Sequence, residues 1–330
     1  MTKKYVWLPC ALGALALLLT SCEKRVEAPG PTDRETAPTA AKAPAGPATT
    51  PSAPVDGAVT LSAPATVVAG GLLLAKWTGP GNAADYIDIV PRGDTKTSGE
   101  LTYSYVKDSK GDGLSVRVPT QPGDYDLRYV LDLGTTRVVK ATQAITVTPA
   151  IATLTAPAEA LGGAEIKVMW TGPNGSGDYI DLVSAGATAT RGEITYAITS
   201  AGMPAVMRVP GAAGSYEFRY VLEGTGGRQV IARTALKVTT PTATLAAPQT
   251  VGNGGDVQVT WTGPGNSDDY IDLVPKGHAP TSGELTYFYT RVGPTGKLTA
   301  PAKPGDYEIR YVLDAPGGRL VLARAPLTVN

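Results

Sequence analysis

Cysteine and histidine are nearly absent from this sequence of 330 residues, which contains only Cys10, Cys22 and His278. One histidine and no thiol after Cys22 exclude a Ser-His-Asp triad, a cysteine nucleophile within a folded domain and a zinc site built from thiolates and imidazoles. Because Cys10 lies in a segment that we expect to be removed, no disulfide is expected in the mature monomer. We therefore predict a protein that is not an enzyme and that binds no metal or other cofactor.

The sequence also lacks an excess of charge, since 29 Lys and Arg residues balance 29 Asp and Glu residues. Removal of Lys3 and Lys4 with the N-terminal segment leaves 27 basic and 29 acidic residues, a formal charge of −2. This balance is not the electrostatic footprint of a nucleic-acid-binding protein, and no polybasic membrane patch is present.

The N-terminal apolar run, residues 6–19, is too short for a comfortable transmembrane helix. It follows two lysines and precedes small residues, so residues 1–21 are expected to be a cleaved signal peptide. The sequence Leu-Thr-Ser-Cys at 19–22 resembles the lipobox of bacterial lipoproteins, which implies that Cys22 is lipidated and begins the mature chain. The alternative is an ordinary signal in which Cys22 has no role. Glu23 stands where inner-membrane lipoproteins commonly carry Asp, so the resemblance implies an anchor in the outer membrane.

Residues 22–57 combine the lipidated cysteine with a segment dominated by Pro, Ala, Thr and Ser. Such a segment has too few large apolar side chains to offset the entropy of ordering, so we expect a disordered tether.

A repeated block organises the remainder of the chain. The segment Trp-Thr-Gly-Pro-Gly-Asn-Ser-Asp-Asp-Tyr-Ile-Asp-Leu-Val at 261–274 has copies that begin at Trp77 and Trp170. The spacing is 93 and then 91 residues, which is too long for a solenoid unit and suits a domain with its own core. The predicted domains are 58–148, 150–239 and 242–330.

Each unit shows the period of two that is typical of β-strands, with Gly or Pro about every ten residues. For the first unit we predict strands near 58–63, 72–78, 85–90, 100–106, 113–118, 124–131 and 136–147. Many short strands at even spacing predict an all-β protein of three tandem immunoglobulin-like antiparallel β-sandwiches.

Tyr125, Tyr216 and Tyr307 begin the sixth predicted strand of each unit, where such sandwiches often carry a tyrosine whose hydroxyl returns to the backbone. The Trp, Asp-Tyr-Ile and Tyr-x-x-Arg-Tyr-Val signatures resemble those of uncharacterised immunoglobulin-like modules in bacterial envelope proteins. That resemblance covers about 58–330 and implies no particular activity.

Asp88 and Arg128 occupy neighbouring predicted strands and alternate outward from the core. The structural interpretation is an exposed cross-strand ion pair, and the functional one is a flat surface that receives a partner. The candidate binding face comprises Tyr86, Asp88, Arg128, Tyr179, Asp181, Arg219, Tyr270, Asp272 and Arg310.

Three other sets of polar or aromatic residues could bind calcium, catalyse glycoside hydrolysis or bind sugars, but each has a more common structural explanation or lacks a required feature. The Asn and Asp residues after each Trp, such as Asn82 and Asp85, match no calcium loop and are better explained by turn chemistry. Glu100 and its copies Glu193 and Glu284 could pair with the repeated Asp as glycosidase carboxylates, but the sequence shows no cleft. Pairs of tyrosines at i and i+2 could stack on sugars, although packing on the sheet surface is the commoner role. They are Tyr103 with Tyr105 and Tyr287 with Tyr289.

These observations predict a non-enzymatic cell-envelope lipoprotein whose tandem domains act as a spacer or as a surface for protein interaction or adhesion. The alternative is a protein that binds a glycan or peptidoglycan through exposed tyrosines. The expected partners are the membrane, through the lipid anchor, and an unidentified envelope protein or glycan, but no nucleic acid.

Overall fold

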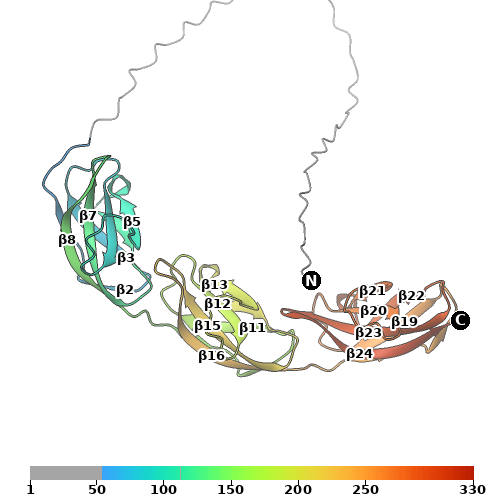
Figure 1. The fold of residues 1–330 in the computed structure, drawn as a ribbon. Helices are drawn as coiled ribbons and strands as arrows, with labels where there is room; N and C mark the ends of the chain where they lie inside the picture. The colour runs from blue at the N-terminus through green and yellow to red at the C-terminus, as the bar shows by residue number, and fades with distance from the viewer. Residues whose placement is uncertain (1–53, 112) are drawn as a thin grey trace, which may run out of the picture. The chain divides into compact units, whose positions relative to one another are not determined.

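The computed structural model describes residues 54–111 and 113–330 (Figure 1). The expected signal peptide, Cys22 and most of the expected tether lie outside these residues. Within the described ranges the regular structure consists of β-strands and three short 3-10 turns. No helix in this part of the chain is long and apolar enough to cross a membrane.

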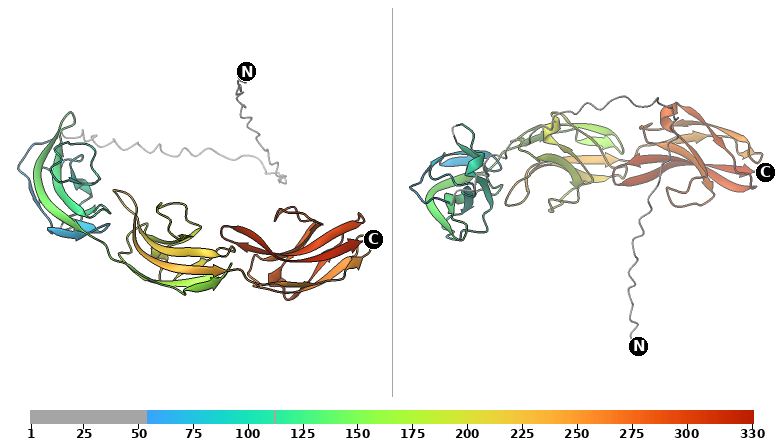
Figure 2. Two further views of the ribbon diagram at one scale, coloured as in Figure 1. Left: turned by 60° about the horizontal axis from the view of Figure 1, so that its bottom comes forward. Right: turned by 90° about the horizontal axis from the view of Figure 1, so that it is seen from above.

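The strands of the first repeat form sandwich 1, in which a three-stranded sheet faces a five-stranded sheet (Figure 2). The strand orders are β1-β3-β6 and β2-β8-β7-β4-β5. The strands are β1 (Thr60–Ser62), β2 (Thr66–Val68), β3 (Leu72–Thr78), β4 (Tyr86–Pro91), β5 (Thr102–Tyr105), β6 (Leu114–Arg117), β7 (Gly123–Asp132) and β8 (Arg137–Thr148).

Sandwiches 2 and 3 repeat this arrangement of three and five strands. Sandwich 2 comprises β9 (Thr153–Thr155), β10 (Glu159–Leu161), β11 (Glu165–Thr171), β12 (Tyr179–Ser184), β13 (Thr195–Ile198), β14 (Ala205–Arg208), β15 (Gly214–Leu222) and β16 (Gln229–Thr239). Sandwich 3 comprises β17 (Thr244–Ala246), β18 (Thr250–Val251), β19 (Asp256–Thr262), β20 (Tyr270–Pro275), β21 (Thr286–Tyr289), β22 (Thr295–Thr299), β23 (Gly305–Ala315) and β24 (Gly318–Val329).

The predicted all-β class and immunoglobulin-like sandwich architecture are confirmed, with one difference in each repeat. An eighth strand of two or three residues, such as β2, pairs in parallel with the last strand of its repeat, so the sandwiches are not wholly antiparallel. A strand this short shows no readable alternation, which is why the pattern did not reveal it.

The core follows from the alternation along the strands. In β19 the side chains of Val257 and Val259 are fully buried and that of Trp261 is half-buried, while the residues between them are exposed. Apolar side chains of both sheets form one main cluster in each repeat, as expected when two half-apolar sheets pack face to face.

The predicted tyrosine corner is also present in all three repeats. The hydroxyl of Tyr125 donates to the carbonyl oxygen of Gln121 at 2.9 Å. Tyr216 and Tyr307 make the same bond to the residue four positions upstream, at 3.1 and 2.9 Å. The hydroxyl thereby satisfies a carbonyl of the turn that leads into the long strand β7, β15 or β23.

The described residues belong to one compact unit, in which successive repeats contact each other. Arg117, at the end of β6, donates to the carbonyl oxygens of Ser176 at 3.0 Å and Glu223 at 2.7 Å in the next repeat. Arg208 occupies the equivalent place in β14 and donates to the carbonyl oxygen of Asp314. The equivalent residue of the third repeat is Thr299. The linking arginine thus contacts the next repeat from both sandwich 1 and sandwich 2.

Candidate functional site

The repeated Asp and Arg form a bidentate ion pair in each sandwich. Asp88 on β4 lies directly opposite Arg128 on β7. The Nε and Nη2 atoms of Arg128 donate to Oδ1 and Oδ2 of Asp88 at 3.0 and 2.6 Å. The pairs Asp181–Arg219 and Asp272–Arg310 have the same geometry. The predicted cross-strand pairing is therefore correct.

The prediction that these pairs are exposed is wrong. The side chain of Asp88 is 0% exposed and that of Arg128 is 2% exposed, and both members of the other two pairs are 0% exposed. The cause is a segment of chain that crosses the outer face of the five-stranded sheet, which we call the latch loop. It spans 92–101 in sandwich 1, 185–194 in sandwich 2 and 276–285 in sandwich 3.

The arginine itself holds the latch loop in place. The Nη1 atom of Arg128 donates to the carbonyl oxygens of Asp94 and Lys96 at 2.9 and 2.8 Å. The hydroxyl of Tyr86 donates to a third loop carbonyl, that of Thr97, at 3.2 Å. Corresponding bonds recur in sandwiches 2 and 3. The guanidinium therefore ties two strands and a loop together, and its hydrogen bonds to Asp88 raise the pKa of Arg128.

All nine residues of the candidate binding face lie beneath this loop or against it. None of them is more than 6% exposed, so they do not form the open, flat surface that we predicted. The sequence signal that was missed is a pair of glycines six residues apart with φ near +80°, Gly93 and Gly99. The copies Gly186 with Gly192 and Gly277 with Gly283 share this conformation, which L-residues rarely adopt.

A second buried carboxylate organises the loop after each Trp. Asp85 is 0% exposed and accepts hydrogen bonds from the backbone N–H of Asn82 at 2.9 Å, the hydroxyl of Tyr129 at 2.8 Å and the N–H of Asp132 at 3.0 Å. Asp178 and Asp269 repeat this set. These partners are hydrogen-bond donors and not cation ligands, which supports the turn interpretation over calcium. No cluster of metal-ligating side chains occurs among the described residues.

The aromatic side chains that remain exposed lie on β5, β13 and β21, each at one edge of its five-stranded sheet. Tyr103 is 47% exposed, Tyr196 57% and Tyr287 49%. In sandwich 1 the Tyr103 ring packs edge-on against Tyr86 at a centroid distance of 5.7 Å, and the guanidinium of Arg137 lies 5.5 Å from the Tyr86 ring centroid. The predicted exposed tyrosines are thus sheet-surface residues with one open side.

Beside each exposed tyrosine lies a glutamate with one side-chain oxygen that accepts no hydrogen bond from the part of the chain that the structure describes. The Oε2 atoms of Glu100, Glu193 and Glu284 are buried and have no hydrogen-bond partner among the described residues. A buried acceptor without a donor calls for water, a proton or a ligand. We call the repeated set the edge platform. It comprises Glu100, Tyr103 and Arg137 in sandwich 1, Glu193, Tyr196 and Arg228 in sandwich 2, and Glu284, Tyr287 and Arg319 in sandwich 3.

The edge platform does not have the arrangement of a glycosidase. The Asp that would serve as nucleophile, such as Asp88, already accepts hydrogen bonds from Arg128 at both oxygens. A nucleophilic carboxylate needs an oxygen that is free to reach the sugar. The arrangement can bind a ligand through aromatic faces, a guanidinium and one carboxylate oxygen.

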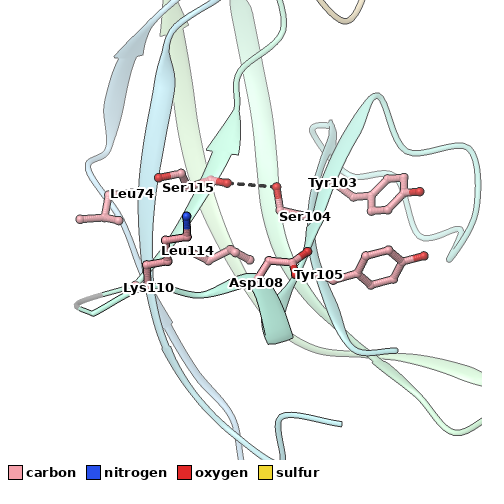
Figure 3. Close-up of a pocket in the computed structure, with 9 residues that line it drawn as sticks. Leu74, Tyr103, Ser104, Tyr105, Asp108, Lys110, Leu114 and Ser115 are labelled. Carbon is pink, nitrogen blue, oxygen red and sulfur yellow. Dashed lines mark hydrogen bonds between the residues drawn. The ribbon is translucent and has the colours of Figure 1, made fainter. Parts of the chain in front are cut away.

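A hollow of about 610 Å³ lies beside β5 (Figure 3). It is lined by Leu74 and Leu114, by polar and charged residues, and by Tyr103 and Tyr105 of β5. The hydroxyl of Ser104 donates to the carbonyl oxygen of Ser115 at 3.0 Å, whereas the rings of Tyr103 and Tyr105 point away from this hollow (Figure 3). The hollow and the platform therefore adjoin each other at β5, and Tyr103 belongs to both.

Comparisons with known proteins add little to this geometry. No protein-family model and no curated protein matches the chain. Among solved structures, the FN1–FN3 domains of chicken CNTN1 align over 83% of this chain and 98% of theirs, with 13% identity and a TM-score of 0.22. A chain from the complex of the mouse coronavirus receptor-binding domain with its murine receptor aligns over 55% of this chain and 99% of its own, with 13% identity and a TM-score of 0.21. At these TM-scores neither likeness supports an argument about function.

We expect Asp272→Asn to destabilise sandwich 3 by about 3–5 kcal/mol, because it leaves the buried Arg310 without its counter-charge. The matched control is Asp256→Asn, since the Asp256–Lys297 pair is more than half exposed at both side chains and its loss should change little. Hydrogen exchange of the mature chain, resolved by peptide, should show that Asp272→Asn loses protection in 244–329 only. Equal protection in the two variants would contradict a structural role for the buried pair.

Burial raises the pKa of Tyr270 to about 12, above the value of about 10 expected in the unfolded chain. The stabilisation associated with this pKa shift is present below about pH 10 and is lost as the pH rises toward 12, because the unfolded chain releases its proton first. Tyr270→Phe should therefore make the unfolding free energy less dependent on pH in this range. Urea unfolding at several alkaline pH values measures the slope, and an unchanged slope would refute the assignment.

Proposed function

We propose that the protein is a non-enzymatic lipoprotein of the cell envelope, anchored in the outer membrane through Cys22, whose tandem sandwiches present a surface for protein interaction or adhesion and act as a spacer. The binding role is supported by a contrast between two sets of polar side chains in each sandwich. The buried Asp and Arg side chains are satisfied internally, whereas the edge platform keeps an exposed tyrosine and an unused carboxylate oxygen.

The position of the platform suits a protein partner. Strands β5, β13 and β21 end their sheets, so their outward-facing side chains lie at a sheet edge, where partners are commonly bound. Tyr and Arg are the residue types that contribute most to protein interfaces, because they offer large contact areas and hydrogen bonds together. Repetition in three sandwiches would increase avidity for a partner that carries several copies of one feature.

A glycan is the second candidate ligand. It is favoured by Tyr103, Tyr196 and Tyr287, whose open sides could stack on sugar rings beside a carboxylate that accepts a hydroxyl hydrogen bond. The tyrosines of the candidate binding face, Tyr86, Tyr179 and Tyr270, are buried and donate to latch-loop carbonyls. A sugar would therefore meet the edge platform and not the predicted face.

The anchor is tested by Cys22→Ser. We expect this variant to lose acylation and to move from the membrane fraction to the soluble fraction, because the thiol that would carry the lipid is absent. Metabolic labelling with a fatty acid and membrane fractionation measure the two effects. Unchanged labelling and membrane association would overturn the lipoprotein assignment.

The binding surface is tested by replacing Tyr103, Tyr196 and Tyr287 with Ala together. In-cell crosslinking should then trap less of a defined envelope protein, because each platform loses its exposed ring. The control combines Leu74→Ala with Met169→Ala, which removes exposed apolar side chains from the three-stranded sheets. Capture that is equally reduced in the control, or unchanged in the triple variant, would overturn the platform as the interface.

Retention on cell-wall polysaccharide resin distinguishes the second candidate. If the unmodified chain is retained on the resin, the triple variant is not retained, and crosslinking traps no protein, the glycan is the favoured ligand.

A further inference from the structure

The edge platform of sandwich 3 opens into a hollow of about 340 Å³ that is lined by all three of its residues. This volume lies in the range of small-ligand sites. Its walls are three tyrosines, three carboxylates and one arginine. They are Tyr270, Tyr287, Tyr289, Asp268, Glu284, Asp314 and Arg319.

The aromatic walls leave one ring face available. The Tyr287 ring lies edge-on to Tyr270 at 6.0 Å and to Tyr289 at 5.5 Å. Arg319 covers the Tyr270 ring at 5.3 Å and Arg291 covers the Tyr289 ring at 4.0 Å. Among the described residues, no cationic side chain stacks on Tyr287, which is 49% exposed. The protein thus places cations on the two flanking rings and leaves the central ring open.

The charges of the lining favour a cation on that ring. Arg319 is neutralised by Asp314, whose Oδ2 accepts from its Nε at 2.8 Å. Asp268 is 3.4 Å from Arg208 and 4.0 Å from Arg291, so it is already partly compensated. Glu284 has neither a cation within salt-bridge distance nor a donor to its buried oxygen among the described residues. The hollow therefore holds one carboxylate that has no salt-bridge partner and has one oxygen without a hydrogen-bond donor among the described residues.

We propose that this hollow binds the ammonium group of a lysine side chain from the protein partner. This inference rests on the proposed protein-interaction function and specifies the partner's chemistry. The ammonium group and its adjoining methylene lie over the open face of Tyr287, and the ammonium donates to the carboxylate of Glu284. Both contacts favour a cation, since the ring face is negative and a charge-assisted hydrogen bond is stronger than a neutral one.

Sandwich 2 provides a matched control within the same chain. Gly177, Arg191 and Ile198 occupy the places of Asp268, Ser282 and Tyr289. Arg191 lines the hollow beside Glu193 and Tyr196, so a cation of the protein itself is already near that carboxylate. Sandwich 2 should therefore bind an ammonium group much more weakly than sandwich 3.

The test uses the mature chain with Nα-acetyl-lysine-methylamide and its uncharged isostere Nα-acetyl-norleucine-methylamide, observed by saturation-transfer NMR. We expect saturation of the lysine methylenes and at least severalfold less of the norleucine ones. Glu284→Gln should weaken lysine binding about tenfold, which corresponds to about 1.4 kcal/mol. In a chain that also carries Tyr103→Ala, which removes the matching ring of sandwich 1, Tyr287→Ala should abolish binding, and Tyr287→Phe should retain it because the aromatic face remains. Glu193→Gln and Tyr196→Ala should leave it unchanged.

Equal saturation of the two probes, or unchanged lysine binding in the Glu284→Gln variant, would overturn the lysine assignment. N-acetylglucosamine added as a third probe reports on the alternative. Binding of the sugar without the lysine probe would overturn the proposal in favour of the glycan. The crosslinking experiment described above tests the proposed function separately. If the chain still captures a partner at the platform but does not bind the lysine probe, only the inference that the partner presents a lysine is refuted.

Discussion

The buried ion pair between β4 and β7, and its copies, is the interaction on which each sandwich depends. Removing two charges from water is costly unless their hydrogen-bonding groups are satisfied. Asp88 satisfies the Nε and Nη2 of Arg128, and the remaining Nη1 binds two carbonyl oxygens of the latch loop. The pair therefore requires the loop as a third layer, and the loop in turn excludes water from the pair. Neither part would be stable in this position without the other.

This constraint determines which surfaces remain available to partners. The latch loop covers the middle of the five-stranded sheet and leaves the edge strand β5, β13 or β21 open. The exposed tyrosine of each edge strand packs against a buried tyrosine whose hydroxyl is bonded to the loop. The platform is thus rigid because it rests on the latch. Rigid aromatic groups lose little conformational entropy on binding, which suits them to recognition.

The sequence predicted the strands, the tyrosine corner and the partners of the ion pair, because each of these depends on local alternation or on the repeat register. It did not predict the burial of the pair. Alternation places Asp88 and Arg128 on the side of the sheet away from the core, but it does not reveal whether another segment covers that side. Whether a loop covers the ion pair depends on a tertiary contact, and the only local sign of that loop in the sequence was the pair Gly93 and Gly99. The platform was missed for the same reason, since its unused carboxylate oxygen is defined only by what surrounds it.

Differences between the repeats separate the residues that hold the fold from those that can distinguish partners. The Asp and Arg of the ion pair, the Asp of the Trp loop and the corner tyrosine are the same in all three copies, and all of them are tied into internal hydrogen bonds. Variation instead occurs around the platform, where Ile198 replaces a tyrosine, and at the end of the linking strand, where Thr299 replaces an arginine. The three copies thus share one scaffold, and the differences lie where a neighbouring repeat makes contact or where we propose that a partner binds.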